Sequence, residues 1–218
     1  MTAVRRCLPT LPFALRRAAR TLAVALAATT AAIALAAVPA QAADTSPAWT
    51  LDRLMSTLAQ HKSGRATFTE TKYLSIATQP VESSGELVFV APDHLEKHTL
   101  SPKPEHLVVD GDMLTVERNN RKYTLALARY PELGAFIDSI RATLAGNRFA
   151  LEQVYKVALA GRGDGWTLTL TPLDSRMLKV VSAITLDGTR DVLRSVAIRQ
   201  ADGDRSVMHL QPVPANPN

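Results

Sequence analysis

Cysteine is almost absent from this 218-residue chain, in which Cys7 is the single copy. Acidic residues are absent from residues 1–42, where five arginines are followed by an apolar, Ala-rich run of 18 residues. The run ends just before an Ala-Gln-Ala motif at residues 40–42. A basic start, an apolar run and an A-x-A motif predict a secretory signal peptide cleaved before Ala43, with retention as a membrane anchor as the alternative.

The chain expected after export has no cysteine and no net charge. Because Cys7 lies in the predicted signal peptide, the remainder cannot form disulfides, thiolate metal sites or a cysteine nucleophile. The five arginines lie there too, and without them the chain has 20 basic and 20 acidic residues. The net positive charge of the whole sequence therefore comes from the arginines of the predicted signal peptide. We expect a periplasmic protein that binds neither nucleic acid nor an anionic membrane surface.

Catalytic motifs are also missing. The sequence has no G-x-S-x-G elbow, and the glycines of residues 161–165 lack the strand-to-helix setting of a phosphate loop, so we expect a hairpin there. His94 and His98 are four residues apart, which on a strand separates them by about 13 Å, too far to share a metal ion. They are expected to belong to a solvated polar face together with Asp93, Glu96 and His106. We therefore predict no catalytic residue, metal or cofactor.

About 176 residues follow the signal peptide, enough for one domain at residues 43–212 with a Pro-rich tail at 213–218. An apolar repeat up to Gly64 predicts an N-terminal amphipathic helix that is capped by Ser46 and starts with proline. Helical spacing of apolar residues predicts a second helix at 131–146, and a short third helix is expected at 147–156.

Alternation with period two predicts strands over the rest of the chain. We expect about ten, at residues 65–74, 85–90, 94–100, 105–110, 113–118, 122–128, 165–173, 177–188, 191–200 and 205–213. Runs of strands interrupted by helices are typical of the α+β class. Strand twist accumulates, so a sheet of about ten strands must curl or close, and we predict a large antiparallel sheet with the helices covering one face. The pattern leaves open whether that side packs solid or encloses a cavity.

Apolar residues indicate which faces of the strands are covered. In residues 166–171, apolar and threonine side chains alternate, which predicts one buried and one wetted face. In residues 87–90, the side chains that point to either face of the strand are all apolar, which predicts a strand covered on both sides.

An ordered set of residues adds a resemblance to a known family. Behind the N-terminal helix come Phe68-x-Glu70, Gly85-x-Leu87-x-Phe89-x-x-Pro92-x-x-Leu95 and Leu107-Val108-Val109-Asp110-Gly111. This set resembles the periplasmic outer-membrane lipoprotein carrier family, LolA. The order of elements agrees over the whole exported chain, and the specific residues lie mainly between 68 and 111.

The resemblance implies a function and a set of partners. LolA-like carriers have an incomplete barrel whose apolar concave face is lidded by helices and shelters the acyl chains of a lipoprotein in transit between membranes. The implied partners are an acylated lipoprotein or lipid cargo, an inner-membrane exporter and an outer-membrane acceptor, with the carrier a monomer. We predict a lid helix at 132–145 and a lining made of Leu87, Phe89, Phe136, Ile140, Leu144, Trp166, Leu168 and Leu170. The alternative for each lining residue is ordinary core packing.

Three positions depart from the family pattern. Ala91 stands before the motif proline, where typical carriers have an arginine that latches the lid to backbone carbonyls. Lys97 stands at a usually aromatic position, and Glu70 replaces a common glutamine. Alanine cannot replace a guanidinium with its several donors, so the chain resembles a divergent LolA-like branch, of the kind associated with other acylated or polyene lipids.

Two other functions stay open. One is an envelope sensor like RseB, which uses a LolA-like domain to detect misrouted lipoproteins and to bind an anti-sigma factor, although this chain has no room for RseB's second domain. The other is a hydrolase of an envelope lipid, with a polar site formed by Asp93, His94 and His98.

Overall fold

A computed structural model of the chain describes residues 47–214. The predicted signal peptide at 1–42 lies outside this range, as do residues 215–218 of the predicted tail. Within 47–214, none of the helices has both the length and the apolar character that a membrane span requires.

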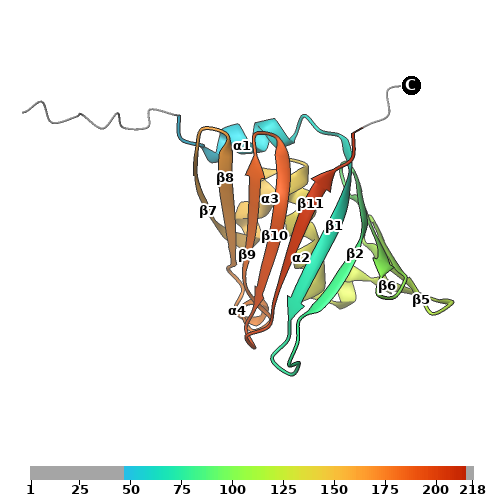
Figure 1. The fold of residues 1–218 in the computed structure, drawn as a ribbon. Coiled ribbons are helices and arrows are strands. Elements are labelled where there is room, and N and C mark those ends of the chain that lie inside the picture. The colour runs from blue at the N-terminus through green and yellow to red at the C-terminus, as the bar shows by residue number, and fades with distance from the viewer. Residues whose placement is uncertain (1–46, 215–218) are drawn as a thin grey trace, which may run out of the picture. The chain divides into compact units, whose positions relative to one another are not determined.

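Eleven antiparallel strands form one sheet that curls without closing (Figure 1). Its order is β6-β5-β4-β3-β2-β1-β11-β10-β9-β8-β7, so two meanders are joined through the pair β1 and β11. The strands are β1 (Ser63–Tyr73), β2 (Val81–Val90), β3 (His94–Ser101), β4 (Glu105–Asp110), β5 (Met113–Arg118), β6 (Arg121–Ala126), β7 (Tyr155–Arg162), β8 (Gly165–Pro172), β9 (Val181–Thr189), β10 (Val192–Gln200) and β11 (Arg205–Pro212). The predicted α+β class and incomplete barrel are confirmed.

The helices connect the two edges of this sheet. Between β6 and β7 the chain forms the 3₁₀ turn η1 (Leu127–Arg129), α2 (Pro131–Leu144) and α3 (Arg148–Val154), which lie across one face of the sheet (Figure 1). We call this the helix face and the opposite one the outer face. Two further helices are α1 (Leu51–Leu58) and α4 (Ser175–Leu178). The expected lid helix at 132–145 corresponds to α2.

Two local predictions, one for the start of α1 and one for β2, are wrong. Helix α1 starts four residues later than expected, because Thr50 is its N-cap and accepts a hydrogen bond from the Arg53 amide, while Ala48 pairs with Arg162 in an isolated bridge. The strand of residues 87–90 is not covered on both sides, since Val90 is 43% exposed on the outer face.

The larger hydrophobic core lies under α1 and α3. It contains Leu168, Leu170, Ile184 and Leu186, all fully shielded from solvent, and Leu151 of α3 at 1% exposure. Each fully buried aliphatic side chain contributes roughly 1.5–3 kcal/mol. This half of the sheet is therefore closed by its own side chains.

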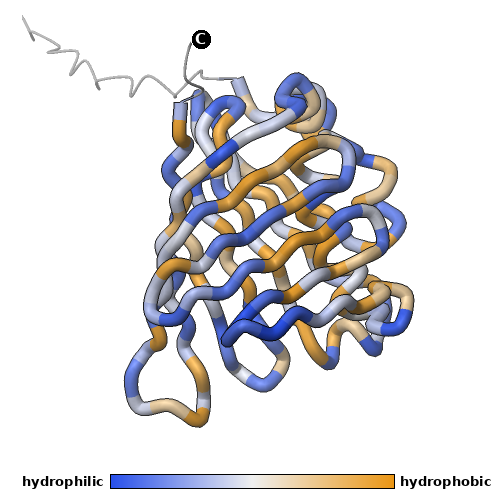
Figure 2. The backbone as a smooth tube through the Cα atoms, turned by 90° about the vertical axis from the view of Figure 1, so that its right-hand side faces the viewer, coloured by the Kyte–Doolittle hydropathy of each residue, from blue (hydrophilic) through white to orange (hydrophobic). Residues whose placement is uncertain are grey.

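A smaller core lies where α2 crosses the other half of the sheet. Val109, Leu114, Leu127 and Ile137 are buried there. Phe136 of α2 packs against both cores and so joins them. In Figure 2, which faces the β2 to β6 side, the tube changes repeatedly between hydrophilic and hydrophobic colours along these strands, as expected when residues alternate between two faces.

Candidate ligand-binding face

Three predicted lining residues on β8 lie in the larger core. Trp166 is 2% exposed, and Leu168 and Leu170 are fully buried. The Trp166 indole lies over Gly188 of β9, where an added Cβ would come within 2.0 Å of its Cζ2 atom. Its Nε1 donates a hydrogen bond to the Arg190 carbonyl at 2.8 Å. The packing around these three residues is tight and leaves them fixed in position.

The other five predicted lining residues lie on β2 and α2. Phe89 is buried and Leu87 is half-buried against the larger core, where Phe136 also packs. Ile140 and Leu144 are half-buried on the stripe of α2 that begins with Leu133. The structure thus brings Leu87 and Phe136 to one core and leaves Ile140 and Leu144 partly open. A lining role remains a prediction for all eight residues.

The helix face of β3 to β6 is apolar but only partly covered. Register pairs Leu95 with Val109, and Leu107 with Val116, on this face. Besides the buried Val109 and Leu114, half-buried side chains surround α2 here, namely Leu95, Leu107, Val116 and Leu125. Both cores have half-buried apolar neighbours, but buried residues outnumber them in the larger core, whereas four residues are buried and six are half-buried in the smaller core beneath α2.

Helix α2 is tied to the sheet by Arg141. Its Nη1 donates to the carbonyl of Asp93 at 3.0 Å and to that of Gly111 at 2.7 Å, while Nη2 pairs with Asp138. Only 12% of the Arg141 side chain is exposed. Asp93 precedes β3 and Gly111 follows β4, so one guanidinium holds the helix to two turns. We call this group of contacts the Arg141 latch.

A tyrosine fixes the other side of α2. Tyr155, the first residue of β7, is 2% exposed, and its hydroxyl donates to the Ala135 carbonyl at 3.1 Å. Burial raises the pKa of this phenol to about 12, because the charged form would lose its hydration. Helix α2 is therefore held by a neutral hydroxyl toward β7 and by a charged latch toward β3 and β4.

Two of the three departures from the family pattern contact each other. The Lys97 ammonium lies 2.7 Å from the Glu70 carboxylate, which is 5% exposed, and 4.9 Å from the centre of the Phe68 ring. Lys72 and the Ser83 hydroxyl also approach Glu70, at 3.6 and 3.4 Å. Lys97, where the family usually has an aromatic residue, thus neutralises Glu70, where the family commonly has glutamine. The buried charge of each of these two residues is therefore compensated by the other.

Two hollows lie away from α2. One, of about 310 Å³, lies between β1, β2 and β11 and is lined by Thr67, Thr69, Glu86, Leu100 and His209. The other, of about 530 Å³, lies beside the ends of β3 to β6 and is lined in part by His98 and His106. Neither of these two hollows is lined by a residue of α2.

The predicted polar group near His94 lies on the outer face. Glu96 binds His94 through one carboxylate oxygen, at 2.8 Å, and His98 through the other, at 2.6 Å. Among the described residues, neither histidine hydrogen-bonds a hydroxyl group, and the Asp93 carbonyl belongs to the Arg141 latch. A hydrolase site at Asp93, His94 and His98 is not supported by this arrangement.

The fold and the latched helix define an incomplete β-barrel with a helical lid. A model of the family described as "Outer membrane lipoprotein carrier protein LolA-like" matches residues 37–213. The chain therefore belongs to the LolA-like family.

Two solved structures match most of this chain at low sequence identity. A LolA superfamily protein from Nitrosomonas europaea is 10% identical with a TM-score of 0.40, over 78% of this chain and 96% of that one. The lipoprotein LppX from Mycobacterium tuberculosis is 12% identical with a TM-score of 0.42, over 76% of this chain and 94% of that one. No curated protein matches this sequence.

Proposed function

We propose that this protein is a periplasmic carrier that shelters the acyl chains of a lipoprotein or another lipid between α2 and the helix face of β3 to β6. The observation that carries the proposal is the difference between the two halves of the sheet. Leu168 and Leu186 are fully buried, whereas Leu107, Val116 and Leu125 keep accessible apolar surface under a latched helix. Membership of a family of lipoprotein carriers supports the same function.

The energies are compatible with opening of the lid by the cargo. Burying a 16-carbon acyl chain contributes roughly 12 kcal/mol before the costs of binding, at about 0.8 kcal/mol per CH₂. Releasing the two hydrogen bonds from Arg141 to carbonyls costs about 3–6 kcal/mol, at 1.5–3 kcal/mol for each bond to a charged group. The acyl chain would also have to replace the apolar contacts that Phe136 and Ile137 of α2 lose on opening, and neither step requires a polar anchor or a catalytic residue.

The proposal includes the route and the partners implied by the family. An inner-membrane exporter would deliver the acylated cargo and an outer-membrane acceptor would receive it, with the carrier acting as a monomer after removal of its signal peptide. The departures at Ala91, Lys97 and Glu70 favour a cargo other than the lipoproteins of the housekeeping carrier.

Native mass spectrometry of the protein purified after expression of the full-length chain tests this function. We expect a bound acylated species, released by organic solvent, and its loss in Ile140→Asp, which puts a carboxylate on the half-buried stripe of α2 without entering either core. Phe149→Asp is the matched control, because Phe149 is 75% exposed on α3. A wild-type protein without acylated ligand, or equal occupancy in the Ile140 variant, contradicts the proposal.

A further inference from the structure

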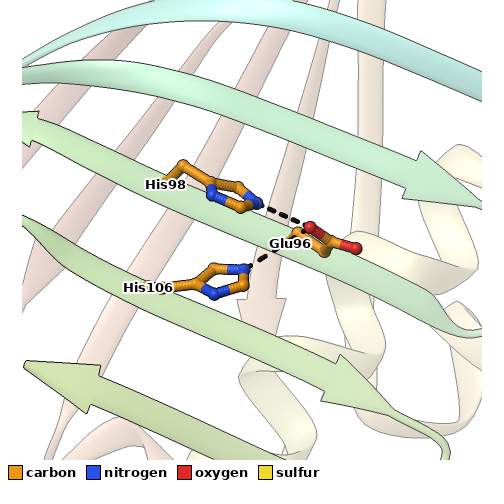
Figure 3. A group of neighbouring side chains, drawn as sticks. All are labelled: Glu96, His98 and His106. Carbon is orange, nitrogen blue, oxygen red and sulfur yellow. Dashed lines mark hydrogen bonds and ion pairs between the residues drawn. The ribbon is translucent and has the colours of Figure 1, made fainter.

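Three side chains that bind metals in proteins meet on the outer face, away from the helices (Figure 3). Glu96 and His98 are two residues apart on β3 and so point the same way. His106 is the register partner of His98 on β4. Leu95, which precedes Glu96 on β3, packs in the smaller core on the helix face. The topology thus fixes all three side chains on one side of the sheet.

The distances suit a single ion. His98 Nε2 lies 2.6 Å and His106 Nε2 3.5 Å from the same Glu96 oxygen, Oε2. One ligand atom from each residue lies within 4.8 Å of the other two. Around a tetrahedral zinc ion with bonds near 2.1 Å, donors lie about 3.4 Å apart, so small side-chain rotations suffice.

His106 has a ring nitrogen without a hydrogen bond. Its Nε2 is shielded from solvent and forms no hydrogen bond, although the ring stacks on His98 with centroids 3.8 Å apart. A shielded polar nitrogen usually has a partner. Its nearest partner is Glu96 Oε2 at 3.5 Å, and a metal ion between Glu96, His98 and His106 would supply a closer one.

His94 orients the carboxylate. Its Nε2 contacts Glu96 Oε1 at 2.8 Å, and its Nδ1 lies 3.8 Å from Asp110. Oε2 is therefore the oxygen that faces His98 and His106. An outer partner that fixes a ligating carboxylate in this way is typical of protein metal sites.

We propose that Glu96, His98 and His106 form a binding site for one divalent transition metal ion of the zinc class. Two imidazoles and one carboxylate favour such an ion over calcium or magnesium, which prefer oxygen ligands. Three protein ligands leave a fourth position for water or an incoming group. His98 and His106 line the hollow of about 530 Å³, so this position is reached from solvent.

The site would join the two strands that support the Arg141 latch. Glu96 and His98 lie on β3 and His106 on β4, and the latch carbonyls belong to Asp93, just before β3, and Gly111, just after β4. A bound ion cross-links these strands on the outer face. The site itself does not depend on the proposed carrier function, because it involves no residue of the helix face.

Titration calorimetry with ZnCl₂ tests the site on protein purified from the full-length chain without a polyhistidine tag. We expect one ion per chain, counted independently by native mass spectrometry. His98→Ala and His106→Ala should each weaken binding at least about tenfold, the loss that even an outer partner of a metal site causes. Zinc should also raise the melting temperature of the wild type and of neither variant.

Two further variants complete the test. His61→Ala is the matched control, because His61 is exposed and paired with Asp191 outside the cluster, and it should bind zinc like the wild type. Glu96→Gln keeps the shape of the side chain and should weaken binding, which covers the case in which an alanine variant does not fold. The absence of one-to-one binding, or unchanged affinity in the His98→Ala/His106→Ala double variant, would overturn the proposal.

Discussion

Arg141→Ala should release α2 from the sheet while leaving the rest of the fold intact. The substitution removes the hydrogen bonds to the carbonyls of Asp93 and Gly111 and the pair with Asp138. Hydrogen bonds to a charged group contribute about 1.5–3 kcal/mol each, and the freed carbonyls regain part of this from water, so we expect a loss of about 3 kcal/mol. Because each 1.4 kcal/mol is a factor of ten, the opening of α2 should become roughly a hundredfold more frequent.

Hydrogen exchange of individual amides measures this opening. Protection of the α2 amides should fall by about two orders of magnitude, with β8 and β9 unchanged, because local opening exposes only the affected segment. Arg148→Ala is the control: its pairs with Asp52 and Glu152 are exposed, and such pairs contribute about 1 kcal/mol or less. Unchanged protection of α2 in Arg141→Ala, or an equal loss over β8, would refute the latch.

Three further substitutions test the packing around the helix face. Lys97→Met leaves the carboxylate of Glu70 without its nearest cation and should cost about 3 kcal/mol of unfolding free energy in urea. The double variant Glu70→Gln/Lys97→Met should recover most of this loss, and a strictly additive result would disprove the coupling. Tyr155→Phe tests the raised phenol pKa: the folded value of about 12 exceeds the unfolded value near 10, so the wild type keeps this stabilisation below pH 10 and loses it as the pH rises toward 12. Denaturation curves at pH 9 to 12 should show a smaller decline in the variant, and identical slopes would argue against it. Gly188→Ala places a methyl group 2.0 Å from Trp166 and should cost about 3 kcal/mol with a change in tryptophan fluorescence, whereas wild-type stability would mean that the indole can move aside.

The strands of the sheet and helix α2 could be predicted from the sequence better than the short helices and the ends of the strands. Period-two alternation identified most strands and the helical stripe identified α2, because both patterns follow directly from burial on one face. Residues 155–162 form β7 although the short third helix was expected to reach 156. The strand expected from Met177 begins only at Val181, because Ser175–Leu178 forms α4, which Asp174 caps by accepting hydrogen bonds from the amides of Arg176 and Met177.

The contacts of the candidate site could be predicted only in part. Glu70, Lys97 and Ala91 stood out as departures, but the pairing of Glu70 with Lys97 depends on how β1, β2 and β3 align. Arg141 looks like an ordinary basic residue in the last turn of a helix, and its burial becomes evident only when α2 is placed over two turns.

The histidine group shows the same limit of sequence reasoning. Spacing along β3 predicted that His94 and His98 are too far apart to be ligands of one ion, and this stays a prediction. The group is completed by His106, which reaches His98 only through the register of β3 and β4. Ligands contributed by neighbouring strands have no fixed spacing in a sequence.

Photocrosslinking with an acyl chain tests the central claim most directly. A palmitate analogue with a diazirine in its chain is bound to the protein, irradiated, and located by mass spectrometry of the digested protein. We predict labels on α2 and on helix-facing residues of β3 to β6, such as Ile140, Leu107 and Val116, and an excess of unlabelled palmitate should prevent them. Labels confined to the outer face, or labels that palmitate does not reduce, would contradict an acyl-binding site beneath α2.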